Sequence, residues 1–95
     1  MTDTMSGITE DTLVQWAETA ISTEIEGELV ALDVTKGVCY GLNRVGTRIW
    51  QLLEQPRSAR EVADILVEQF DVSPEECREQ TLNLVRELAA AELVR

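Results

Sequence analysis

Hydrophobic and polar residues follow two different periods along this chain. Residues 21–26 alternate Ile, Thr and Ile with Ser and two Glu, and this period of two is typical of a half-buried strand. Residues 29–32 and 38–42 are rich in apolar and β-branched side chains. The Asp-Val-Thr-Lys-Gly stretch between them, residues 33–37, has turn chemistry and a glycine that can adopt a positive φ. The pattern predicts three strands, of which the second and third form a hairpin.

The helical period begins directly after this hairpin. Asn43 occupies an N-cap position, and the apolar residues behind it recur at helical spacing, which predicts a helix over 44–54 that ends before a proline. Residues 58–61, Ser-Ala-Arg-Glu, are a capping box that begins a second helix. A third helix is predicted over 74–91, because it starts with a proline followed by two acids.

Together these elements predict one α+β domain, in which a three-stranded antiparallel sheet packs on three helices. Ninety-five residues suffice for a single hydrophobic core. Residues 1–12 are polar and acidic and contain a glycine, so we expect a flexible acidic tail before a domain over 13–95. Two interpretations of residues 13–17 stay open, since they fit either the beginning of the first strand or a short helical turn.

The charge of the chain argues against nucleic acid as a partner. The net charge is −10, and residues 1–35 hold eight acids and no Lys or Arg, whereas residues 36–95 hold ten acids and eight bases. A field of this sign repels phosphate backbones. A winged-helix DNA-binding regulator would share the helices, but the only bases on the third helix are Arg78 and Arg86, beside four Glu, so this class is disfavoured.

The sequence also bears on where the protein is found. No apolar run approaches the roughly 18–20 residues that span a bilayer. The N-terminus has neither the positive region nor the apolar region of a secretion signal. We therefore expect a cytoplasmic protein with no membrane partner.

Few residues in the chain could support catalysis or hold a cofactor. There is no His, which removes the commonest general base and the commonest zinc ligand. Cys39 and Cys77 lie far apart in sequence, form no CxxC pair and are expected to be small buried residues. The acidic clusters lack the spacing of a calcium loop, and no glycine-rich phosphate loop is present. We expect no enzyme activity, no cofactor and no metal.

Two surfaces remain as candidate binding sites. The strand over 38–42 contains no Pro, Lys or charge, so an extended peptide could pair with its edge, unless the N-terminal segment covers that edge. The third helix has a second apolar strip formed by Leu82 and Ala89, beside a stripe expected to face the core, which consists of Cys77, Thr81, Leu84, Val85 and Leu88. The alternative for that second strip is ordinary contact with the first helix or the sheet.

Residues 21–93 resemble the PqqD-like family, the recognition elements of ribosomal peptide (RiPP) biosynthesis. The matching pieces are Asp33 and Gly37 at the turn, Tyr-Gly-Leu-Asn at 40–43, Val-Gly-Thr-Arg-Ile-Trp at 45–50, and Phe-Asp-Val at 70–72. The resemblance implies a three-stranded sheet beside a winged helix-turn-helix-like bundle. It also implies that the leader segment of a precursor peptide adds as a strand along the third strand, in the groove against the third helix.

The resemblance thus implies a non-catalytic peptide-binding site. On the strand this site comprises Val38, Cys39, Tyr40, Gly41 and Leu42, and on the third helix it comprises Arg78, Leu82, Val85, Arg86 and Ala89. The Tyr-Gly-Leu-Asn segment is similar to the free-standing leader-binding half of a split lasso-peptide B protein, whose partners are a precursor leader peptide, a leader peptidase and a macrocyclising enzyme. The alternative is a PqqD-type chaperone in pyrroloquinoline quinone synthesis or another RiPP pathway.

Overall fold

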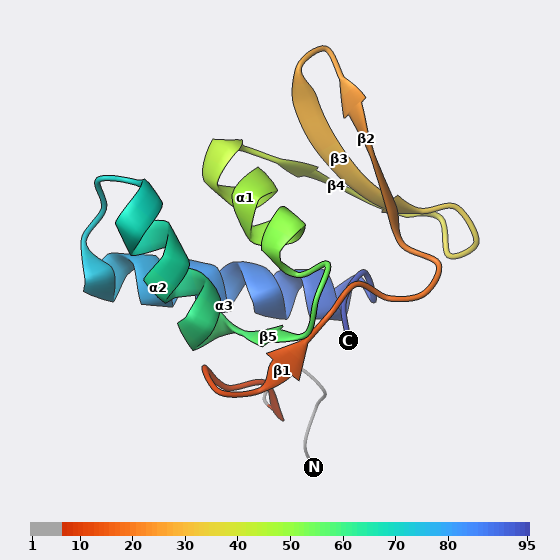
Figure 1. Cartoon of the computed structure of the whole chain (residues 1–95). Coiled ribbons are helices and arrows are strands. Elements are labelled where there is room, and N and C mark those ends of the chain that lie inside the picture. Colours follow the sequence, from red (N-terminus) through yellow and green to blue (C-terminus); the bar gives the residue numbers. More distant parts are fainter. Residues whose placement is uncertain (1–6) are drawn as a thin grey trace.

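Three antiparallel strands form the main sheet of this protein, for which a computed structural model describes residues 7–95 (Figure 1). They are β2 (Ile21–Ile25), β3 (Glu28–Asp33) and β4 (Val38–Leu42), in the order β2-β3-β4. Glu26 and Gly27 join β2 to β3 with positive φ angles of 54° and 85°, as a tight hairpin turn requires. Gly37, with φ 71°, closes the turn between β3 and β4. The predicted three-stranded antiparallel sheet is confirmed.

Three helices follow, and the first two have the caps that the sequence predicts. In α1 (Arg44–Leu52) the side chain of Asn43 accepts a hydrogen bond from the backbone of Gly46 at 2.7 Å. The start of α2 (Ala59–Gln69) carries the complete capping box between Ser58 and Glu61. The third helix, α3 (Pro74–Ala90), begins with proline, but Ser73 makes no side-chain cap bond. The first helix is two residues shorter than predicted because residues 53 and 54 form a turn.

A second, two-stranded sheet was not predicted. In it β1 (Leu13–Val14) pairs antiparallel with β5 (Arg57–Ser58). Next to it, Trp16 forms an isolated bridge with Val94, close to the C-terminus. The open question about residues 13–17 is thereby answered, since this segment is extended but belongs to a different sheet from β2. The N-terminal segment therefore runs across the helices before it turns into the main sheet (Figure 1).

Residues just before β1 contact the helices as well. Arg86 on α3 donates two hydrogen bonds to the carbonyl oxygen of Ile8, at 3.1 and 3.0 Å. Arg60 on α2 forms ion pairs with Glu10 at 3.2 Å and with Asp11 at 2.8 Å. These contacts join residues 8–11 to both helices. The first half of the predicted tail, residues 1–6, lies outside the described residues.

The core lies between the helices, the N-terminal segment and the inner face of the sheet. Trp16 stacks on Trp50 with ring centroids 5.1 Å apart, and the Trp16 indole N–H donates to the Trp50 carbonyl at 2.8 Å. The sheet contributes Ala31 and Leu42, both buried. Within residues 7–95, no helix is long and apolar enough to cross a membrane.

A buried carboxylate fixes the hairpin on this core. Asp33, at the end of β3, is completely buried and accepts a hydrogen bond from the hydroxyl of Thr19, ahead of β2. It also accepts from the backbone N–H of Lys36 at 3.1 Å, and the ammonium of Lys36 lies 3.7 Å from Glu92, just after α3. The hydrogen bond from Thr19, and then the N–H and charge of Lys36, lower the pKa of Asp33 although burial opposes this.

We expect Thr19→Val to make the protein more sensitive to acid. A carboxylate whose pKa is lowered in the folded state stabilises the fold above its ordinary pKa of about 3.9 and loses that contribution as pH falls through the folded pKa. Without the hydroxyl, the pKa of Asp33 rises toward its ordinary value, so acid unfolding begins at a higher pH. Tryptophan fluorescence during acid titration measures this midpoint. Thr23→Val, on exposed β2, is the matched control, and an equal midpoint for both variants would contradict the role of Asp33.

Candidate functional site

Both outer strands of the main sheet have an edge that no strand of residues 7–95 pairs with, and the edge of β4 is the one beside α1 and α3. Within residues 7–95, β4 pairs with β3 on one side and no strand pairs with its other side. The sequence left open whether the N-terminal segment covers this edge, but that segment pairs with β5 and with Val94 instead. Alternate backbone N–H and C=O groups of β4 therefore point away from the sheet and are free to bind an added strand.

A small groove runs beside this edge. It encloses a cavity of about 210 Å³ where β4, the start of α1 and the middle of α3 meet. The cavity is lined by Tyr40, Gly41, Leu42, Asn43, Val45, Gly46, Ile49, Gln80 and Leu84. Because the chain passes from β4 to α1 through the single residue Asn43, the strand and the helix are held at a fixed angle on two sides of this groove.

Gly46 allows the walls of the groove to approach closely. A Cβ atom at this position would lie 3.2 Å from Oδ1 of Asn43, 3.3 Å from Cδ2 of Leu42 and 3.4 Å from Cδ2 of Leu84. Glycine therefore brings the first turn of α1 against both β4 and α3 without a side chain between them. Because both side chains lie next to Gly46, Leu42 and Leu84 are close together in the lining of the groove.

A polar contact joins β4 to α3 at Tyr40, which lines the groove. The hydroxyl of Tyr40 donates a hydrogen bond to the carboxylate of Glu87. This bond, together with partial burial and the negative charge of Glu87, raises the pKa of Tyr40 above its ordinary value of 10.0. The tyrosine is therefore a neutral donor at physiological pH, and the carboxylate gives this end of the groove an acidic character.

The strand half of the predicted site lies on β4, next to the groove. Tyr40, Gly41 and Leu42 line the cavity. Val38 is half-buried and packs against the core, on the same strand face as Tyr40. Cys39 is exposed on the opposite face, so the expectation that both cysteines are buried is wrong for Cys39 and right for Cys77.

The helix half of the predicted site does not face β4. Val85 is fully buried in the core, Arg86 is bound to the Ile8 carbonyl, and Ala89 lines a different cavity. Arg78 is exposed and Leu82 is half-buried, and neither lines the groove beside β4. The reason is helical geometry, since these residues point away from the stripe that faces the strand.

That stripe consists of Gln80, Leu84 and Glu87, spaced four and three residues apart. Residues 82 and 86 each lie two positions from Leu84, which corresponds to about 160–200° around the helix. Sequence reasoning assigned Leu84 to the core and did not single out Gln80 or Glu87. The i, i+4, i+7 spacing of Gln80, Leu84 and Glu87 places them on one helix face. The spacing alone does not single out this face, because several faces of α3 carry apolar residues.

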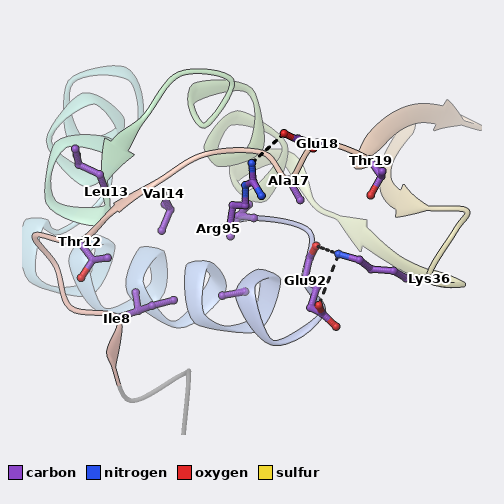
Figure 2. A pocket seen from close by; sticks show the side chains of 12 residues that line it. Ile8, Thr12, Leu13, Val14, Ala17, Glu18, Thr19, Lys36, Glu92 and Arg95 are labelled. Carbon is purple, nitrogen blue, oxygen red and sulfur yellow. Dashed lines mark hydrogen bonds and ion pairs between the residues drawn. The ribbon is translucent and has the colours of Figure 1, made fainter. Parts of the chain in front are cut away.

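A larger cavity lies on another side of the molecule (Figure 2). Its volume is about 580 Å³, and its lining comes mainly from residues 8–19 and from the C-terminal residues. The charged residues on it pair with one another, Arg95 with Glu18 at 3.3 Å and Lys36 with Glu92 at 3.7 Å. No residue of β4 lines it, so it is separate from the open sheet edge.

Comparison with known families agrees with this geometry. The sequence profile of the family described as Coenzyme PQQ synthesis protein D (PqqD) matches residues 28–94. The chain belongs to the PqqD family. The matched region begins with β3 and includes β4, the three helices and the groove between them. No curated protein matches the chain.

Three solved structures have the same fold. TbiB1 in complex with the TbiA(β) leader peptide is 30% identical with a TM-score of 0.74, over 85% of this chain and 94% of that chain. A lasso peptide synthetase B1 complexed with the leader peptide is 21% identical with a TM-score of 0.74, over 86% and 96%. The PqqD part of Methylobacterium extorquens PqqCD, described as a functional stand-alone RiPP recognition element, is 14% identical with a TM-score of 0.79, over 96% and 97%. This PqqD-family chain therefore has the fold of a RiPP recognition element.

The two thiols should differ sharply in reactivity. Cys39 is exposed on β4, whereas Cys77 is buried and its sulfur lies 3.7 Å from the Ala63 carbonyl oxygen. We expect a thiol reagent such as DTNB to modify one cysteine quickly in the native protein and the second only after denaturation. Cys39→Ser should abolish the fast reaction, and two fast thiols in the native protein would contradict the placement of Cys77.

Proposed function

We propose that this PqqD-family protein binds the leader segment of a ribosomally made precursor peptide and presents it to processing enzymes without catalysing a reaction itself. The leader adds as a strand to the free edge of β4, where unpaired backbone groups supply hydrogen bonds that depend little on sequence. The single observation that carries the proposal is this open edge beside an apolar groove.

The groove supplies the sequence preference. Its volume of about 210 Å³ is below the range of typical small-molecule pockets, so it suits one or two side chains of a bound peptide. Leu42, Ile49 and Leu84 line it and favour an aliphatic or aromatic anchor. Near Tyr40, the carboxylate of Glu87 favours a hydrogen-bond donor or a basic residue of the leader.

The pathway we propose is lasso-peptide biosynthesis. The support is the 30% identity to TbiB1, a protein solved in complex with a leader peptide, over 85% of this chain. In that pathway the partners would be a leader peptidase and a macrocyclising enzyme. By holding the leader, the protein would raise the effective concentration of the cleavage region at the peptidase. A PqqD-type chaperone role in quinone synthesis is the second candidate, because the matching family profile carries that description.

Two leucines on α3 provide a matched test of the groove. Leu84 lines the cavity beside β4, whereas Leu82, also half-buried, lies on another side of the same helix. We expect Leu84→Gln to weaken leader binding by about tenfold or more, which corresponds to ~1.4 kcal/mol. Leu82→Gln should leave the affinity within about twofold, since it removes no groove contact.

Fluorescence anisotropy with a labelled lasso-type leader peptide measures both affinities, and urea unfolding shows whether each variant is folded. An equal loss of affinity in both variants at equal stability would contradict the groove assignment. A quinone-precursor leader titrated in parallel distinguishes the two pathways. Saturable binding of that peptide alone would overturn the lasso assignment, and binding of neither peptide would overturn the proposed function for these leaders.

A further inference from the structure

The sheet has an apolar face that no part of residues 7–95 covers. The register pairs Ile21 with Leu32 and Thr23 with Val30, and these two β3 residues are in turn paired with β4. Residues paired in this way share one face of the sheet. We call this the outer sheet face, and it consists of Ile21, Thr23, Ile25, Glu28, Val30, Leu32, Cys39 and Gly41.

The opposite face is the one that packs on the core. It carries Ala31, Asp33 and Leu42, all of which are buried. On the outer sheet face, by contrast, the side chains of Ile21 and Ile25 are 54% and 55% exposed. Figure 1 shows the reason, because the β2–β3 hairpin stands clear of the three helices.

Such a composition is unusual for a sheet face in water. An antiparallel sheet with one buried face normally carries polar residues on the other, whereas this outer face has Ile, Val and Leu at four of its positions. The period of two in β2 predicts a half-buried strand, and yet all five residues of β2 are exposed. A contiguous apolar surface of this kind is typical of a site that is covered by another molecule.

We propose that the outer sheet face is the docking surface for the enzyme that processes the bound leader, and that this enzyme presents an apolar surface with Lys or Arg around it. The charges on the hairpin select this occupant. On the outer sheet face Glu28 is paired directly with Ile25, Glu26 lies in the adjoining turn, and residues 1–35 contain no base. A second copy of this chain would bring like charges together, whereas a basic rim complements them.

The outer sheet face adjoins the leader site, which favours the same occupant. This inference rests on the proposed function. Cys39 and Gly41 belong to the outer sheet face and also to β4, the strand whose free edge takes the leader. A leader strand added there extends this face by one strand. A protein that covers the face would therefore contact the recognition element and the leader together, and should bind more tightly when the leader is present.

Substitutions on the outer sheet face test whether its binding function is distinct from that of the groove. Ile21→Thr/Ile25→Thr keeps two β-branched residues in the strand but makes the patch polar. The matched control is Val72→Thr, which changes a 38% exposed valine in the link between α2 and α3. The probes are a labelled leader peptide, titrated by anisotropy, and the purified leader peptidase of the same pathway, titrated by calorimetry with and without leader.

We expect the affinity of the double variant for the leader to stay within about twofold of that of the unchanged protein. Its affinity for the peptidase should fall about tenfold. Val72→Thr should leave both affinities unchanged. Unchanged peptidase affinity in the double variant would overturn the proposal. So would a dimer in light scattering that the double variant dissociates, because the occupant would then be a second copy. Failure of the unchanged protein to bind the leader would instead overturn the proposed function, and the leader titration reports it separately.

Discussion

The N-terminal segment pairs with β5 and with Val94, and the open edge of β4 depends on this pairing. A three-stranded sheet has two edges, and the most economical way to protect β4 would be to pair it with another part of the same chain. Here the segment before β2 does not take that place, because Trp16, backbone hydrogen bonds and the arginines of α2 and α3 hold it against the helices. The edge of β4 consequently stays open on a well-packed domain.

A second constraint gives this edge its shape. The chain moves from β4 into α1 through Asn43, and Gly46 lets that helix approach Leu42 and Leu84. The strand, the first turn of α1 and one stripe of α3 therefore meet at a fixed geometry, which buried Asp33 reinforces at the far end of the hairpin. Recognition by main-chain pairing needs such a rigid strand, because any ordering of the sheet on binding would reduce the affinity.

The sequence predicted the main strands and the helix starts, since each has a local signal in period, cap or turn residues. It left open whether the N-terminal segment covers the edge of β4. It missed β1 and β5, because a pair of two-residue strands has no period to detect. It named Leu82 and Arg86 on α3 as leader contacts, whereas the α3 residues that line the groove beside β4 are Gln80 and Leu84. Because α3 is apolar on several sides, only the tertiary packing decides which of its partly buried stripes faces β4.

The free edge of β4 is where we expect a leader peptide to pair. Amide hydrogen–deuterium exchange, measured residue by residue with and without a saturating lasso-type leader, tests it most directly. Leader binding should slow exchange at those amides of Val38–Leu42 that point away from β3, with the amides of β2 unchanged. Protection confined to residues 8–19 around the larger cavity, with none in β4, would contradict it.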